Sequence, residues 1–109
     1  MERRIMTYGG YLEEFMSTLD SKVRRKIAYG LVLLKYQDVV SKKFVKYIQD
    51  GLFELRVEWE SNTYRVFFIF DGDRIVVLFN GFQKKSQKTP QKEITKALKI
   101  KNDYYNGRR

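Results

Sequence analysis

The residues best suited to chemistry in this chain are the polar and basic side chains of one short run. The run follows the apolar pair Leu78–Phe79 and reads Asn80-Gly81-Phe82-Gln83-Lys84-Lys85-Ser86-Gln87-Lys88-Thr89-Pro90. Its three lysines are interleaved with side-chain amides, which both donate and accept hydrogen bonds. A basic loop between the end of a strand and the start of a helix is suited to hold phosphate. We therefore expect an anionic ligand at this run.

Most of the positive charge lies in the last quarter of the chain. Residues 84–109 contain nine Lys or Arg and two acids, and so carry +7 of the total net charge of +9. Such a surface favours a polyanionic partner, which is a nucleic acid, an acidic protein segment or an anionic membrane surface. A membrane is the weakest of these expectations, because no apolar run approaches ~18 residues and the N-terminus lacks a signal-peptide pattern.

Two residue types are absent from the 109 residues, and their absence limits the chemistry. The chain has no cysteine and no histidine. It therefore has no disulfide, no thiol nucleophile and no imidazole base, and we expect no cofactor and no metal site. Catalysis would have to use Lys, Arg, Tyr, Glu or Asp. The length and the hydrophobic content of 43% predict a single globular domain over residues 1–109, and the lack of cysteine fits a cytoplasmic protein.

Arg65 is the first arginine whose surroundings require an explanation. It shares a face of a predicted strand with Phe67 and Ile69. An unpaired guanidinium on an apolar face is costly to bury, so Arg65 needs a partner. One interpretation is a buried ion pair with Glu54, Glu58 or another carboxylate. The other is a position at the edge of a cleft, where Arg65 binds a phosphate with two hydrogen bonds.

Arg56 is the second such arginine, and it lies on the polar face of the preceding strand between Glu54 and Glu58. If Ser61-Asn62 closes a hairpin, Glu58 lies opposite Arg65 and Arg56 lies diagonally from it. Two like charges at such a short separation repel each other, and the arrangement is unfavourable unless an anion lies between them. The simpler interpretation is that the flanking glutamates screen the charge of Arg56.

Hydrophobic spacing predicts the elements that carry these residues. Arg3–Thr7 is expected to form an edge strand, and a helix is expected from Tyr11. Asp20 or Ser21 is a suitable cap for a second helix. A short helical segment is then expected over residues 41–51. Its apolar residues are Phe44, Tyr47 and Ile48.

The second half of the chain switches to the alternation that is typical of strands. Phe53–Trp59, Tyr64–Phe70 and Ile75–Phe79 predict a three-stranded antiparallel meander. Thr89 is expected to cap the last helix, with Pro90 in its first position. The predicted fold class is therefore α+β. A small antiparallel sheet, made of the N-terminal edge strand and the meander, packs against two N-terminal helices and is followed by a basic C-terminal helix.

Three strings in this chain resemble the RelE/ParE toxin superfamily, and most of all its HigB-like, phage-derived branch in type II toxin–antitoxin systems. They are Gly51–Val57, Tyr64–Phe68 and Val77–Pro90, and the run Asn80–Pro90 is the most specific of them. The resemblance implies a RelE-like fold and an endoribonuclease that cuts messenger RNA in the ribosomal A site. It also implies a metal-independent attack of the ribose 2′-hydroxyl on its own 3′-phosphate, and a cognate, HigA-like helix-turn-helix antitoxin.

The resemblance also implies roles for particular residues. Arg65 matches the phosphate-contacting Arg of the family's Tyr-Arg motif, and Arg56 stands at a position where relatives carry a basic catalytic residue. Glu54 departs from relatives that have a second basic residue there, so it is expected either to act as general base or to balance Arg56. Lys84 and Lys88 are the candidates for general acid, although the Arg and Tyr of this loop in some relatives are absent. The expected RNA-binding residues are Lys85, Asn80, Gln83, Gln87 and Lys92.

Two other functions use the same fold or the same charge. A ParE-like protein would inhibit DNA gyrase without cutting RNA. A non-catalytic RNA-binding or ribosome-binding module would use the basic surface for affinity alone. Substitution of Arg65 distinguishes the enzyme from the module, because in the module it weakens binding without removing any cleavage product.

Overall fold

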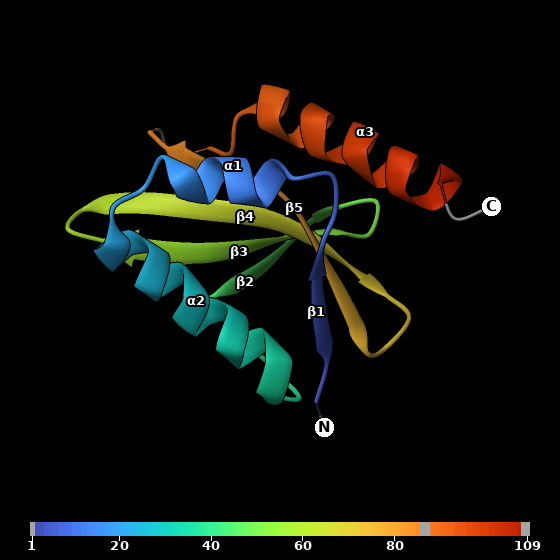
Figure 1. Ribbon diagram of the computed structural model, residues 1–109, viewed down its shortest axis with the longest axis horizontal. Helices are drawn as coiled ribbons and strands as arrows, with labels where there is room; N and C mark the ends of the chain where they lie inside the picture. The colour runs from blue at the N-terminus through green and yellow to red at the C-terminus, as the bar shows by residue number, and fades with distance from the viewer. Residues whose placement is uncertain (1, 86–87, 108–109) are drawn as a thin grey trace.

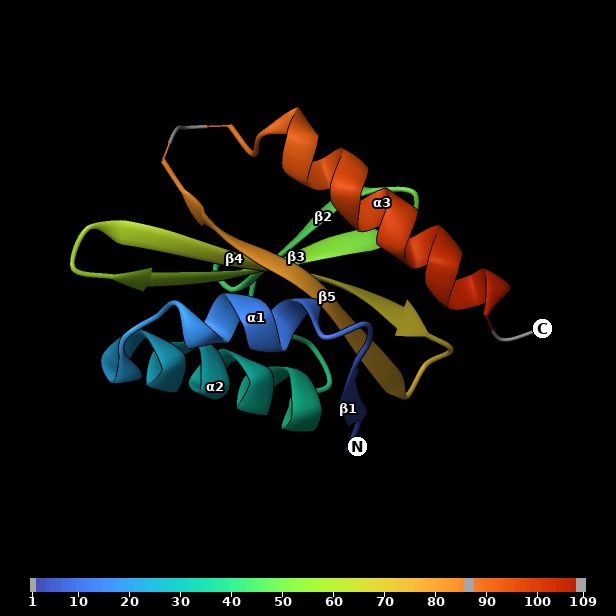
Figure 2. The ribbon, with the colours of Figure 1, turned by 45° about the horizontal axis from the view of Figure 1, so that its top comes forward.

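The computed structural model describes residues 2–85 and 88–107, and within them the chain forms a five-stranded sheet and three helices (Figure 1). Helices α1 and α2 lie on one face of the sheet and α3 on the other (Figure 2). The predicted α+β class is thus confirmed. The elements are β1 (Arg4–Thr7), α1 (Tyr11–Ser17), α2 (Ser21–Tyr36), β2 (Val45–Gln49), β3 (Leu52–Trp59), β4 (Asn62–Asp71), β5 (Ile75–Lys84) and α3 (Gln91–Asn106).

The strand order in the sheet is β1-β5-β4-β3-β2. Strand β1 pairs parallel with β5, and the other neighbours are antiparallel. The N-terminal edge strand and the antiparallel meander are present as predicted, but the parallel pairing of β1 with β5 makes the sheet mixed, where a wholly antiparallel sheet was predicted. In the described residues no helix is long and apolar enough to cross a membrane.

The helical segment predicted over residues 41–51 is wrong, because β2 occupies its centre and turns flank the strand on both sides. Val45–Gln49 pairs antiparallel with β3 and forms the second edge of the sheet. The ring of Tyr47 packs 5.1 Å from that of Phe53, whereas Ile48 packs against the core on the α3 face. Adjacent apolar residues therefore point to opposite faces, as they do in a strand. The open edge of β3 offers backbone hydrogen bonds that outweigh a weak local preference for helix.

The turn between β3 and β4 lies one residue earlier than the sequence predicted. Glu60 and Ser61 both have positive φ, 48° and 67°, as a two-residue turn between antiparallel strands requires. Trp59 therefore pairs with Asn62, one residue earlier than a Ser61-Asn62 turn would give. Moving the turn by one residue shifts the pairing of β3 with β4 by two residues, so each side chain keeps its face but lies opposite a different partner along the whole hairpin.

Two apolar cores lie on the two sides of the sheet, so the central strand β4 is buried on both faces, as its apolar run predicted. On one side Val66 and Phe68 pack under α1 and α2, with Ile27 and Leu34 from α2. On the other side Phe67 and Ile69 pack under α3. The α3 residues in that core are Ile94, Ala97, Ile100 and Tyr104.

Candidate functional site

Polar residues from four neighbouring strands meet on the face of the sheet that α3 partly covers. Paired residues of an antiparallel sheet share a face, and here Lys46 pairs with Glu54, Arg56 with Arg65, and Thr63 with Lys84. Each of these pairs lies on the side where Phe67 packs under α3. We call this group the polar face. It consists of Lys46, Glu54, Arg56, Thr63, Arg65 and Lys84.

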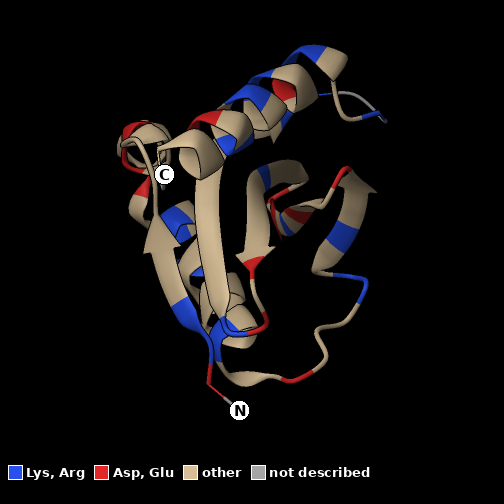
Figure 3. Ribbon diagram, turned by 90° about the vertical axis from the view of Figure 1, so that its right-hand side faces the viewer, with Lys and Arg blue, Asp and Glu red and all other residues tan. Residues whose placement is uncertain are grey.

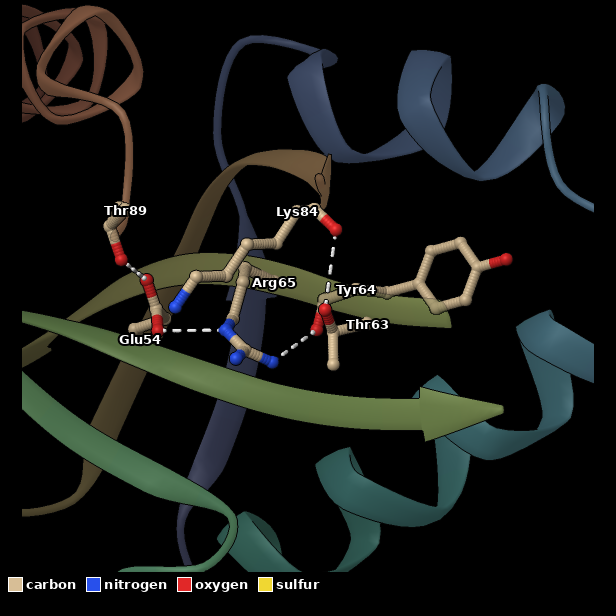
Figure 4. A network of polar contacts seen from close by, with 6 residues as sticks. All are labelled: Glu54, Thr63, Tyr64, Arg65, Lys84 and Thr89. Atoms are coloured by element: carbon tan, nitrogen blue, oxygen red, sulfur yellow. Dashed lines mark hydrogen bonds and ion pairs between the residues drawn. The ribbon is translucent and has the colours of Figure 1, made fainter. Parts of the chain in front are cut away.

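Glu54 and Arg65 form a buried ion pair at the centre of the polar face (Figure 4). Nε of Arg65 lies 2.9 Å from Oε1 of Glu54, and the two side chains are 2% and 1% exposed. Burial lowers the pKa of Arg65 and the charge of Glu54 opposes this shift, so the guanidinium keeps its counter-charge. Of the two interpretations of Arg65, the structure shows the buried ion pair, with Glu54 as the carboxylate, and a side chain that is 2% exposed does not lie at the edge of a cleft.

Thr89 fixes the second oxygen of that carboxylate. Its hydroxyl donates a hydrogen bond of 3.0 Å to Oε2 of Glu54 (Figure 4). The predicted helix cap is therefore wrong: Pro90 is the N-cap, α3 begins at Gln91, and no side chain caps it. A buried carboxylate needs a donor for each oxygen, and this requirement outweighs the local preference of Thr for a cap. The contact ties the start of α3 to β3.

Arg56 lies directly opposite Arg65, not diagonally from it as the sequence predicted. The cause is the tight turn at Glu60 and Ser61, which also pairs Glu58 with Thr63. The charge of Arg56 lowers the pKa of Arg65, whereas Glu58 raises it. Arg56 is half-buried, so its guanidinium is less screened than a fully exposed one. Two opposed guanidinium groups favour an anion between them.

Lys84 extends from the end of β5 over Arg65 towards Glu54 (Figure 4). It is the last residue of β5, not a loop residue, because β5 continues five residues beyond the predicted end at Phe79. Burial lowers the pKa of Lys84, and the positive charges of Arg65, Arg56 and Lys46 lower it further against the opposing effect of Glu54. An ammonium with a lowered pKa gives up its proton more readily than an ordinary lysine.

Two predicted RNA-binding residues are not in a loop as expected. Asn80 is 2% exposed within β5, and among the described residues neither its amide oxygen nor its amide nitrogen has a hydrogen-bond partner. Gln83 pairs with Tyr64, so it points to the opposite face from Lys84, and its amide donates to Asn62 Oδ1 at 3.1 Å. Both were predicted in a loop, and the longer β5 accounts for both differences.

The remaining predicted residues lie around the polar face, not within it. Lys85 is exposed beside Lys84, and Lys92 is exposed in the first turn of α3. Lys88 lines a groove between β2 and the segment before α3. Gln87 lies outside the described residues. Basic residues recur along α3, where acids are few (Figure 3).

Lys46, Thr63 and Thr89 are the residues at this site that the sequence analysis missed. The string Val45–Gln49 contains Val, Tyr and Ile, which are typical of strands, and this signal could have placed Lys46 beside Glu54. No sequence signal connects Thr89 with Glu54, because the two are 35 residues apart. In the residues that the structure describes, no group of three or more acids, histidines or cysteines could hold a metal ion.

The fold and the polar face together define an α+β protein of the RelE type. The crystal structure of an archaeal RelE–RelB complex from Pyrococcus horikoshii OT3 has the same fold, with a TM-score of 0.57 and 16% sequence identity over 81% of this chain and 100% of that chain. No curated protein matches the chain. The family model described as phage-derived protein Gp49-like matches residues 14–102. The chain belongs to this phage-derived, Gp49-like family. The structural match confirms the predicted RelE-like fold.

Proposed function

We propose that this protein is the toxin of a type II toxin–antitoxin system and that it cuts messenger RNA on the translating ribosome, in the cytoplasm. The observation that supports this most directly is the placement of Arg56 opposite Arg65, with Lys84 extending over Arg65 (Figure 4) and a buried carboxylate holding Arg65 in place. Three cations around one point of a half-buried face can stabilise the charge that develops on a phosphorane. RNA supplies its own nucleophile, so the protein needs position and charge more than a reactive side chain.

In this proposal each residue of the polar face has a distinct role. Arg56, which is partly exposed, binds the non-bridging oxygens of the scissile phosphate. Arg65 is 2% exposed and adds its positive charge from beneath them. Lys84 protonates the leaving 5′-oxygen, because its lowered pKa favours proton transfer. Both oxygens of Glu54 are engaged, one by Arg65 and one by Thr89. These contacts favour a role for Glu54 in positioning Arg65. They disfavour the expected alternative, in which Glu54 acts as a general base.

The products would be an RNA fragment with a 2′,3′-cyclic phosphate and one with a 5′-hydroxyl. The 2′-oxygen forms a bond to phosphorus, and the bond to the 5′-oxygen breaks as that oxygen takes the proton of Lys84. A preorganised donor of this kind contributes about 10²–10³ in rate. We therefore expect Arg56→Gln and Lys84→Gln each to reduce cleavage by about two orders of magnitude.

The test is primer extension on messenger RNA from cells that briefly express the wild-type chain, Arg56→Gln or Lys84→Gln. Both residues are partly exposed, so these variants keep the buried pair of Glu54 and Arg65. Lys99→Gln, on the exposed side of α3, is the matched control. Discrete in-frame breaks that need translation and that disappear in the two site variants support the proposal. Growth arrest with intact messenger RNA contradicts it and directs attention to gyrase supercoiling.

The proposed partner is a cognate antitoxin, of the HigA-like helix-turn-helix kind that the sequence resemblance implies. The related archaeal structure is a complex of RelE with RelB. An exposed apolar row on α2 and just beyond it also supports a protein partner, because exposed apolar rows commonly mark protein contacts. The row consists of Tyr29, Val32, Tyr36 and Val39, which are 56%, 50%, 54% and 87% exposed. Co-expression with the neighbouring gene product should restore growth if that product is the antitoxin.

A further inference from the structure

A groove of about 310 Å³ lies beside the polar face, between the edge strand β2 and the segment that leads into α3. Strand β2 contributes Lys46 and Gln49 to its lining, and the other wall contains Lys88 and Thr89. Lys46 is exposed. The four side chains present two ammonium groups, one amide and one hydroxyl, each of which can donate a hydrogen bond. The groove has no acidic lining residue among those described. Its chemistry therefore suits an anion that also carries polar groups.

The groove is continuous with the polar face through Glu54. Thr89 lines the groove and donates to Glu54 Oε2, and the other oxygen of Glu54 contacts Arg65. Lys46 pairs with Glu54 across β2 and β3 and therefore shares its face. The charge of Lys46 is also one of the causes that lower the pKa of Lys84. The groove therefore adjoins the polar face, and Thr89 and Lys46 lie where the two meet.

From this placement we infer that the groove between β2 and α3 binds a second phosphodiester group of the RNA, next to the scissile one, and that Lys46 is its main cation. The inference rests on the proposed function and extends it to a second nucleotide. An RNA chain carries a phosphate at every nucleotide, so a strand held at the polar face presents further anions on either side. An acidic protein segment also carries anions, but only an RNA strand bound for cleavage must pass next to Arg65. The groove is accordingly a substrate-binding site that positions the strand.

The first test measures RNA binding directly, with a fluorescently labelled, mixed-sequence single-stranded RNA as the probe. Its affinity is measured by anisotropy over a range of salt concentrations for the wild type, Lys46→Met and Lys42→Met. Lys42 is exposed and lies four residues before Lys46, outside the groove, so it is a matched control. Loss of one phosphate contact should reduce the slope of log K against log salt by about 0.7 in Lys46→Met. Lys42→Met should keep the wild-type slope.

The second test measures cleavage of messenger RNA in a reconstituted translation system. Lys46→Met should raise the KM about tenfold, the effect of one lost hydrogen bond between charged groups, while kcat changes less. Lys46→Arg should restore the KM, because arginine also binds phosphate. Circular dichroism and thermal melting confirm that each variant is folded.

The outcomes separate this inference from the proposed function. If the wild type cuts messenger RNA but Lys46→Met equals Lys42→Met in both KM and salt slope, the groove is not an RNA site and the inference is wrong. If Lys46→Met weakens only inhibition by the antitoxin, the groove is a protein contact, which also overturns the inference. If the wild type cuts no messenger RNA, the proposed function fails, and the salt slope still decides whether the groove binds RNA.

Discussion

The ion pair of Glu54 and Arg65 runs diagonally between β3 and β4, with Nε and Oε1 2.9 Å apart. In the strand register Glu54 pairs with Phe67, and Arg65 pairs with Arg56. The diagonal contact therefore draws Arg65 towards a carboxylate and leaves Arg56 without that partner. The face keeps an excess of positive charge at Arg56, Lys84 and Lys46, which is the condition for attracting an anion.

The buried pair predicts strong coupling between two substitutions. Glu54→Gln leaves the Arg65 guanidinium buried without a counter-charge, so it should lower the free energy of unfolding by about 3–5 kcal/mol. Arg65→Met leaves the Glu54 carboxylate buried without its counter-charge, and a similar loss of stability is expected. In the double variant neither charge remains, and the total loss should be well below the sum of the two single losses. Urea denaturation of the four proteins at pH 7 measures this.

Arg56→Gln is the control for that cycle, because it removes a guanidinium that is half-buried and not part of the pair. It should not destabilise the protein, since it removes a charge that repels Arg65. Additive losses for Glu54→Gln and Arg65→Met would show that the two side chains do not depend on each other. Such a result would contradict the role assigned to Glu54.

The lowered pKa of Lys84 can be measured without any activity assay. Carbon-13 NMR of the lysine Cε atoms over a pH titration should give a pKa for Lys84 below the ordinary lysine value of 10.5. Arg56→Gln and Lys46→Met each remove a positive charge that disfavours the protonated ammonium, so both should raise this pKa. Lys42→Met should leave it unchanged. A lowered pKa in all variants alike would mean that burial alone causes the shift.

The same titration has a consequence for the proposed cleavage. If Lys84 is the general acid, the rate falls as pH rises through the pKa of Lys84, because only the ammonium donates a proton. In Lys46→Met the alkaline limb should therefore move to higher pH, together with the NMR titration. An alkaline limb that does not follow the pKa of Lys84 would assign the acid role to another residue.

The sequence predicted most of what depends on strong, local patterns. The buried strand β4 has a nearly continuous apolar run, and the single charge in it, Arg65, required a partner that the structure identifies as Glu54. Asp20 was expected to cap α2, and its carboxylate does accept hydrogen bonds from the backbone N–H groups of Lys22 and Val23. These features were predictable because the residues that decide them lie within one element or follow from burial cost.

The features that escaped prediction depend on distant parts of the chain. Strand β2 forms because β3 offers an open edge, and its five residues carry too weak a pattern to indicate this alone. Thr89 was expected to cap a helix, but a buried carboxylate 35 residues away uses its hydroxyl. Asn80 is buried because β5 continues beyond the apolar residues that predicted it. The polar composition of the run Asn80–Pro90 gave no sign of this longer strand.

Gly81, in the run Asn80–Pro90, lies where α1 packs against β5, and a larger residue at this position is predicted to clash with α1. A Cβ atom added at Gly81 would lie 2.6 Å from Cε2 of the Phe15 ring on α1, so the glycine lets α1 approach β5. Gly81→Ala should destabilise the protein by about 1–3 kcal/mol through overpacking. In a Phe15→Leu background, where the ring is absent, the same substitution should cost less. Equal losses in both backgrounds, measured by urea denaturation, would exclude the clash as the cause.

Arg3 links the N-terminus of the chain to the end of α2. Its side chain is 7% exposed, and Nη1 donates to the carbonyl oxygens of Leu34 and Gln37 at 2.7 and 2.6 Å. Nη2 donates to the carbonyl oxygen of Asp38 at 2.8 Å, and the guanidinium lies 5.5 Å from the centre of the Phe70 ring. A cation at a helix C-terminus satisfies carbonyl groups that have no partner within the helix. Arg3 is therefore a C-terminal cap from a distant segment.

Replacing Arg3 by methionine removes this cap and keeps much of the apolar stem. Arg3→Met should lower the free energy of unfolding by about 3 kcal/mol, which corresponds to one or two hydrogen bonds to a charged group. Arg4→Met is the matched control, since Arg4 is the neighbouring residue and is exposed. Amide hydrogen exchange should also become faster at Leu34 and Gln37 in Arg3→Met, because the last turn of α2 opens more often without its cap. Equal free energies of unfolding for the two variants, with unchanged exchange at α2, would mean that water replaces the guanidinium without loss of stability. The contact with Arg3 would then not hold the end of the helix.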